Sequence, residues 1–295
     1  MKKKFLLCKL LLLTIFTSIL YSNDLDEIKK RGELRHIGVP YANFVTGLGD
    51  GLDVELIKGF AKHLGLKYRY VPCSWIDLYD YLIGQEQKNS KDATLLNKTN
   101  PKGDLIANGM TILNWRKEIL NFSNPTFPSG VWLIARADST LTPIKPTNSI
   151  ENDISLVKRK LSGRSVLALK KTGLNPKLYD INNTSNVTIK LLDNKNPDII
   201  ELIPAIIKNE AETTLLDVPD ALIAINKWPG EIKVIGPISE NQLMGVAFRK
   251  TSPLLLNEFN KYFKKIKEDG TYNKLVLKYY PDVFQYYRDF FKQDD

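Results

Sequence analysis

The chain carries a threonine and an arginine at a fixed spacing in the stretch NGMTILNWRKEILNFSNP, residues 108–125. Thr111 follows an expected strand, and Arg116 comes five residues later. The guanidinium group of an arginine binds a carboxylate through two parallel, charge-assisted hydrogen bonds. These two residues therefore indicate a carboxylate site, unless Arg116 only pairs with Glu118 or Asp77 on the surface, where an ion pair contributes little.

A carboxylate and a glycine turn follow two other expected strands. Asp217 comes directly after TTLL and just before Pro219, which suits the first turn of a helix. Thr172 and Gly173 come soon after the expected strand SVLAL. Ligands of open α/β sheets bind beyond the carboxyl ends of the strands. A cation on one wall and an anion on the other complement an amino acid zwitterion, although Asp217 could instead be only a helix cap.

Strand and helix patterns alternate along the chain, which predicts an α/β fold with parallel strands and right-handed crossovers. Strands are expected at 34–39, 67–72, 104–109, 165–169, 187–192, 213–218 and 231–236. Helices are expected at 53–65, 75–84, 198–210, 252–270 and 271–280. Three polar residues stand at or near expected helix starts and are predicted to cap those helices: Asp53, Asn114 and Ser252.

Two polar stretches interrupt this alternation. The stretch at 136–155 is rich in Pro, Ser, Thr and Asn, and we expect it to be the boundary between two α/β halves. The stretch at 85–102 is an unusually long irregular connection for a compact domain. We expect it to be a mobile surface excursion, with a small functional flap as the alternative.

The first 22 residues have the layout of a secretory signal peptide: a lysine-rich start, an apolar run and the small residue Ser22. The unbroken apolar run from Leu10 to Leu20 is shorter than the roughly 20 residues that span a bilayer. We therefore expect a soluble mature chain in the periplasm, with a retained membrane anchor as the alternative.

Composition narrows the function classes. Removing the signal peptide takes four lysines from a formal net charge of +9, and the remaining basic residues are scattered, unlike those of nucleic-acid binders. The mature chain keeps one cysteine, Cys73, which we expect to be a small core residue. With His36 and His63 as the only histidines, we expect no metal and no other cofactor. The mature length predicts two lobes.

Four segments resemble the bacterial extracellular solute-binding proteins of family 3, the polar amino-acid type. They are GLDVELIKGFAKHLGLKYRYVP, GDLIANGMTILNWRKEILNFSNPTF, LLDVPDALIA and FNKYFKKIKEDGTYNKLVLKYYP, and the resemblance covers about residues 24–285. It implies a two-lobed periplasmic-binding-protein fold of type II, in which each lobe is a mostly parallel sheet flanked by helices. A two-strand hinge would join lobe 1, residues 23–130 with 240–295, to lobe 2, residues 131–239.

The resemblance also implies which groups bind the α-carboxylate of a ligand. Thr111 and Arg116 occupy the family's carboxylate-binding element, and Gly109 and Thr111 would add backbone contacts. Thr172 and Gly173 fall in the turn of the second lobe that offers backbone N–H groups to the same carboxylate.

The rest of the ligand has its own implied contacts. Asp217 occupies the position that holds the α-ammonium group. Trp75 and one aromatic of the PYANF segment, either Tyr41 or Phe44, would pack on the ligand side chain. Lys171 departs from the family pattern, which often has glycine there, so the identity of the side chain stays open.

The resemblance implies a monomer that closes on an amino acid by hinge motion and delivers it to a membrane ABC permease. A sensor receptor is the other possible partner, and a chain ending at Asp295 is not expected to be a built-in sensor. The alternative is an enzyme of the same fold, a dehydratase or lyase in which Asp217 or Asp220 donates a proton. The aromatic tail at 284–291 is expected to pack back over the core rather than form a docking surface.

Overall fold

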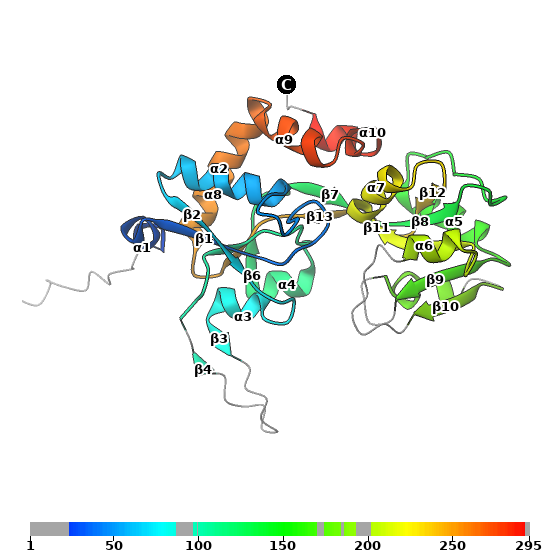
Figure 1. Cartoon of the computed structure of the whole chain (residues 1–295), viewed down its shortest axis with the longest axis horizontal. Helices are drawn as coiled ribbons and strands as arrows, with labels where there is room; N and C mark the ends of the chain where they lie inside the picture. The colour runs from blue at the N-terminus through cyan, green and yellow to red at the C-terminus, as the bar shows by residue number, and fades with distance from the viewer. Residues whose placement is uncertain are drawn as a thin grey trace, which may run out of the picture.

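The computed structural model describes residues 24–86, 97–98, 100–169, 174–183, 186–192 and 202–292. Three expected features lie outside these ranges: the signal peptide at 1–22, the stretch 87–96 of the insertion, and the turn at 171–173. Figure 1 shows the described chain as two lobes side by side, each with its own sheet.

Lobe 1 contains a five-stranded sheet in the order β2-β1-β5-β14-β6. Strand β1 (Glu33–Gly38) runs parallel to β2 (Lys67–Pro72) and to β5 (Leu105–Ile106). Strand β14 (Ala247–Arg249) is antiparallel to β5 and to β6 (Leu120–Phe122). The helices of this lobe are α1 (Asp24–Arg31), α2 (Leu52–His63), α3 (Leu78–Ile83), α4 (Asn114–Ile119), α8 (Pro253–Glu268), α9 (Thr271–Tyr279), α10 (Val283–Tyr286) and the 3₁₀ turn η4 (Arg288–Phe291).

Lobe 2 contains a second five-stranded sheet in the order β10-β9-β11-β8-β12. Strand β9 (Ser165–Leu169) runs parallel to β10 (Thr188–Leu192) and to β11 (Thr213–Asp217). Strand β8 (Val131–Arg136) is antiparallel to β11 and to β12 (Ile232–Pro237). The helical segments are α5 (Ile150–Lys160), α6 (Leu202–Ile207), α7 (Val218–Lys227), and the 3₁₀ turns η1 (Pro176–Tyr179) and η2 (Ile181–Asn183).

The chain passes between the lobes at a pair of short strands. Strand β7 (Phe127–Ser129) pairs antiparallel with β13 (Gln242–Met244), and both run between the two sheets in Figure 1. The expected boundary at 136–155 is wrong, because this stretch leads from β8 to α5 inside lobe 2. Its Ile144 N–H donates to the carbonyl of Ile235 in β12 at 2.9 Å. All strands of the second sheet fall within the proposed range of lobe 2.

The sheet of lobe 1 separates two apolar clusters. Leu105 packs with Phe60 of α2 in the larger cluster. The next residue, Ile106, packs with Leu78 and Leu82 of α3 in the smaller one. Because successive side chains of a strand point to opposite faces, β5 connects the two clusters and is covered on both sides. The expected strand at 104–109 is shorter than predicted, because β5 pairs with its neighbours only at Leu105 and Ile106, and Gly109, at φ +65°, then turns the chain.

Three expected helix caps are not made. The N-cap of α2 is Gly51, and the carboxylate of Asp53 bonds elsewhere. Ser252 occupies the N-cap position of α8, but its side chain makes no capping hydrogen bond. Asn114 is the first residue of α4 rather than its cap.

The aromatic C-terminal segment packs back on the protein, as predicted. Phe291 is 4% exposed and contacts Phe127 of β7, with 6.1 Å between ring centroids. Tyr286 and Tyr287 pack on Trp132 of β8, at centroid distances of 4.7 and 6.1 Å. This segment therefore contacts both lobes beside the hinge. None of the helices in the described part of the chain has the length and apolar character of a membrane span.

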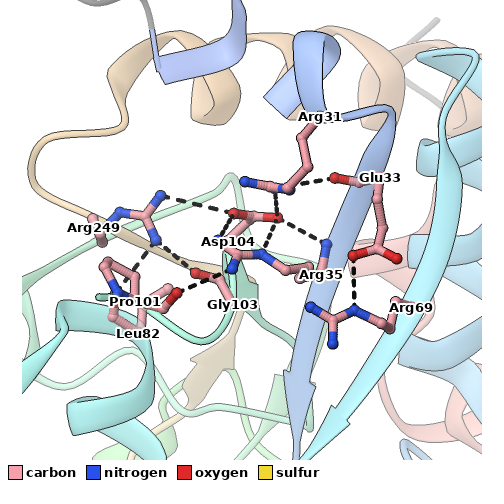
Figure 2. Close-up of polar contacts among 9 residues, drawn as sticks. All are labelled: Arg31, Glu33, Arg35, Arg69, Leu82, Pro101, Gly103, Asp104 and Arg249. Carbon is pink, nitrogen blue, oxygen red and sulfur yellow. Dashed lines mark hydrogen bonds and ion pairs between the residues drawn. The ribbon is translucent and has the colours of Figure 1, made fainter. Parts of the chain in front are cut away.

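One buried carboxylate joins several elements of lobe 1 (Figure 2). Asp104 is 0% exposed and lies 2.5 Å from the Nη2 of Arg31 and 2.9 Å from the Nη2 of Arg35. The Nη2 of Arg249 is 4.0 Å away, and its Nη1 donates to the carbonyl of Gly103 at 2.7 Å. This cluster connects α1, β1 and β14 to the start of β5, the strand that leads to the candidate site.

Asp104→Asn is expected to lower the free energy of unfolding by about 3 kcal/mol, measured by urea denaturation. Removing the charge leaves partly buried guanidinium groups without their anion, which costs about 3–5 kcal/mol in buried pairs, and Arg31 is partly solvated. Glu33→Gln is the matched control, because its pair with Arg69 is solvent-exposed and contributes less than about 1 kcal/mol. Equal effects of the two substitutions would contradict the role given to Asp104.

Candidate functional site

The segment between β5 and α4 is fixed by a buried carboxylate of α2. The N–H of Gly109 donates to Oδ2 of Asp53 at 2.7 Å, and Asp53 is 4% exposed. Any side chain at position 109 would place its Cβ 2.4 Å from the Phe44 ring. Only glycine therefore suits this turn. The N–H of Gly109 is used by Asp53, and the backbone contact to a ligand that the family resemblance implies for Gly109 stays a prediction.

Burial also shifts the protonation of Asp53. Desolvation raises the pKa of this carboxyl group to about 7, although the hydrogen bond from Gly109 acts in the opposite direction. The contact between Asp53 and Gly109 could not be predicted from local sequence, because the two residues are 56 positions apart in the chain.

Arg116 is held by its own loop and keeps free hydrogen-bonding capacity. Its Nη1 donates to the carbonyl of Thr111 at 2.8 Å, while its Nε is buried and has no hydrogen-bond partner. The alternative, in which Arg116 pairs with Glu118 or Asp77 on the surface, is not seen in the described part of the chain, where Arg116 bonds to its own loop instead. The predicted spacing of Thr111 and Arg116 therefore brings the two residues together, with the Thr111 carbonyl orienting the guanidinium.

This loop is also attached to the hinge. Thr111 forms an isolated bridge with Met244 of β13, and the N–H of Ile112 donates to the carbonyl of Leu243 at 2.8 Å. The guanidinium carbon of Arg116 lies 5.1 Å from the centre of the Trp115 ring. The position of Arg116 is thus linked to a strand that joins the two lobes.

Asp217 lies in lobe 2, at the start of α7. It occupies the N-cap position but makes no capping hydrogen bond, so the interpretation of Asp217 as only a helix cap is wrong. Burial raises the pKa of this carboxyl group to about 6, although the nearby Tyr41 hydroxyl acts in the opposite direction. The neighbourhood of Asp217 thus disfavours its charged form.

Tyr41 links the aromatic residues of lobe 1 to α7 of lobe 2. Its ring stacks on Phe44 at a centroid distance of 6.1 Å and meets Trp75 edge-on at 5.9 Å. Its hydroxyl donates to Oδ2 of Asp220 at 3.2 Å. Burial and the nearby carboxylates of Asp220 and Asp217 raise the pKa of Tyr41 well above its usual value.

The two aromatics that the sequence left open are placed differently. Phe44 is 1% exposed and packs edge-on against Phe127 in the core. Tyr41 is only partly buried and contacts Trp75, which is 50% exposed. Phe44 therefore packs in the core against Gly109, whereas Tyr41 keeps solvent-exposed surface that a ligand could contact. The other expected contacts, Thr172 and Gly173, lie outside the described residues.

One residue of this segment was missed from the sequence. Asn108 is 0% exposed, and neither its Oδ1 nor its Nδ2 has a hydrogen-bond partner. Its signal in the sequence is a single amide in the otherwise apolar run LIANGM.

The histidine and the cysteine of lobe 1 have their own surroundings in the fold. His36 is buried, with its Nε2 2.6 Å from the Ala107 carbonyl and its Nδ1 2.8 Å from the Tyr68 hydroxyl. Burial lowers the pKa of His36 to about 4, so the ring is neutral. Burial also shifts the pKa of the Cys73 thiol, which it raises to about 11. Within the described ranges, no three His, Cys, Asp or Glu side chains are grouped so that they could hold a metal ion.

Two hollows in the protein are separate from these groups. One, of about 870 Å³, lies between β12 and the C-terminal segment and is lined by residues such as Trp132, Val234 and Tyr287. The other, of about 270 Å³, lies between α7 and the end of α9 and is lined by residues such as Asn226 and Tyr279. Neither includes Arg116 or Asp217 among its lining residues.

Comparisons with known proteins agree with this architecture. The chain is 27% identical over 238 residues to a membrane-bound lytic murein transglycosylase F of Desulfosudis oleivorans, covering 80% of this chain and 46% of that protein. It thus spans about half the length of this relative. It is 27% identical over 241 residues to a probable histidine-binding protein of Neisseria gonorrhoeae, covering 78% of this chain and 75% of that one.

A solved structure shows the same fold. The ancestral amino acid-binding protein AncCDT-1, a precursor of cyclohexadienyl dehydratase, superposes with a TM-score of 0.62 at 26% identity, covering 88% of this chain and 99% of that one. The sheets, the hinge strands and this likeness identify the fold as that of the type II periplasmic binding proteins. A family model matches residues 38–282, well over half of the chain, and the protein therefore belongs to the bacterial extracellular solute-binding proteins, family 3.

Proposed function

We propose that this protein binds a free amino acid between its two lobes and delivers it to a membrane ABC transporter. The observation that carries the proposal is the guanidinium of Arg116, which is oriented by the Thr111 carbonyl and has a buried Nε without a partner. A buried donor without a partner is unfavourable, and the carboxylate of a ligand would satisfy it.

The ammonium group of the ligand has a matching acceptor. Asp217 lies on lobe 2, and its carboxyl group has a pKa raised to about 6 by burial. A cation beside this carboxylate would restore the charged form. Arg116 and Asp217 thus offer opposite charges from different lobes, and a zwitterion that contacts both would favour closure of the hinge.

The aromatic residues would contact the ligand side chain. Tyr41 and Trp75 lie edge to face, and half of the Trp75 surface is exposed. The name of the Neisseria relative, a probable histidine-binding protein, supports an amino acid as the class of ligand. Periplasmic location, a monomeric state and an ABC permease as the partner complete the proposal.

Arg116→Ala is expected to weaken amino acid binding about 30-fold to several thousand-fold, measured by titration calorimetry on protein stripped of ligand by unfolding and refolding. The range corresponds to the roughly 2–5 kcal/mol lost when one partner of a buried charge pair is removed. Lys117→Ala is the matched control, because Lys117 is an exposed cation on the same helix. A fall of less than threefold for Arg116→Ala would count against the assignment.

Affinity is expected to decrease as the pH falls below about 6. The free protein takes up a proton on Asp217 in this range, and that proton must leave before the carboxylate can hold an ammonium group. Above this pH the affinity should change little, and Asp217→Asn should bind more weakly and lose the dependence. Titrations between pH 5 and pH 8 test this. A dependence that survives in Asp217→Asn would point to Asp53, whose pKa is raised to about 7.

The second candidate function is an enzyme of the same fold. A carboxylic acid whose pKa is raised to about 6 can serve as a proton donor near neutral pH, and Asp217 meets this condition. The likeness to AncCDT-1, a precursor of a dehydratase, favours the same test. Turnover of prephenate- or arogenate-like acids by the purified protein, abolished in Asp217→Asn, would replace the binding proposal with this one.

A further inference from the structure

The buried amide of Asn108 lacks the partners that such a group requires. Among the buried side chains of the described ranges, the polar atoms without a hydrogen-bond partner belong to Tyr70, Asn108, Arg116 and Ser252. Asn108 is the one with two such atoms, an acceptor and a donor group. Buried polar groups in folded proteins are nearly always hydrogen-bonded, so an amide with neither end satisfied needs an explanation.

Asn108 shares its segment with the proposed carboxylate clamp. It follows β5 directly and precedes Gly109, the residue anchored by Asp53. Arg116, the other residue of this segment with a buried atom lacking a partner, lies eight positions later. Two of these four residues, Asn108 and Arg116, thus belong to the segment that would bind the ligand carboxylate.

Asn108 lies at a bend just after the end of β5. Ile106 and Met110, two residues before and after it, both belong to the apolar cluster packed against α3. Asn108 thus stands between two residues whose side chains line the α3 side of the sheet. Trp75 stands in the turn that leads into α3.

We infer that Asn108 is a specificity-determining residue that hydrogen-bonds the side chain of the bound amino acid. The inference rests on the proposed function and names the class of ligand. The Asn108 amide can accept one N–H and donate its own, so it fits a side chain that ends in a carboxamide, imidazole or guanidinium group. Such planar groups also stack on an aromatic ring such as that of Trp75. An apolar side chain would leave the amide unsatisfied, and sites built for hydrogen bonding discriminate strongly against such ligands.

The test compares binding of L-glutamine, L-histidine and L-arginine with that of L-norvaline, whose side chain is apolar. The wild-type protein is expected to bind at least one of the three nitrogen-bearing amino acids at least about tenfold more tightly than norvaline. Asn108→Leu should reduce this ratio about tenfold or more without lowering the melting temperature, because it removes a buried amide without partners. Asn108→Ala should also reduce the ratio, and this variant replaces Asn108→Leu in the test if the leucine variant does not fold.

Two controls separate ligand contact from a purely structural role. Ser252→Ala and Tyr70→Phe each remove a buried hydroxyl that also lacks a partner, but neither residue lies in the β5–α4 segment, so both should keep the wild-type ratio. A ratio unchanged in both Asn108 variants would overturn the inference and assign the amide to a buried water. A preference of the wild-type protein for norvaline would also overturn it. If the wild-type protein bound no free amino acid, the proposed function would fall as well.

Discussion

The hydrogen bond from Gly109 to the buried carboxylate of Asp53 is the constraint on which the candidate site depends. It bends the chain at the end of β5, and the ring of Phe44 beneath Gly109 leaves no room for a side chain. The turn that results places Thr111 beside the hinge strand β13 and leads into α4, which carries Arg116. A single buried acceptor on α2 thus sets the course of the segment that bears the proposed carboxylate clamp.

The proposed function follows from how charge is divided between the lobes. Arg116 lies on lobe 1, in α4, which follows the loop that is bridged to the hinge strand β13. Asp217 lies on lobe 2, at the start of α7. The hydrogen bond between the Tyr41 hydroxyl and Asp220 already joins lobe 1 to α7. A ligand with both charges would add a further connection across the same interface. Binding and closure would then be one process, because the ligand contacts both lobes only when the lobes come together.

Much of the fold could be predicted from local sequence patterns. Strands β2 and β9 begin and end where alternation and flanking residues indicated, and Thr111 and Arg116 were found from their spacing. The prediction that the polar stretch at 136–155 is the boundary between the halves was wrong. Polar composition indicates a solvent-exposed segment, whereas the place where the chain crosses between lobes depends on which strands pair. Strand β8 has an apolar run that is typical of a buried strand, but its place between β11 and β12 depends on strand pairing, which no local pattern shows.

The missed features depend on contacts between distant parts of the chain. Asp53 was predicted to cap a helix. Its actual hydrogen-bond donor, the N–H of Gly109, lies 56 positions away in the chain, so local sequence could not identify it. To tell whether Tyr41 or Phe44 can contact a ligand, one must know that Phe44 packs on Phe127 in the core. To recognise the amide of Asn108 as unsatisfied, one must know that it is buried. Residue type and spacing can therefore suggest a clamp, but the residues that position it are defined by tertiary packing.

The central claim is that one ligand carries both an ammonium and a carboxylate group to this site. Its most direct test is calorimetric titration of the mature protein, stripped of ligand, with L-amino acids and with matched carboxylic acids that lack the amino group. We expect one class of amino acid to bind and its deaminated analogue to bind far more weakly. Equal binding of the two would remove Asp217 from the site, and no binding by a folded protein would contradict the account as a whole.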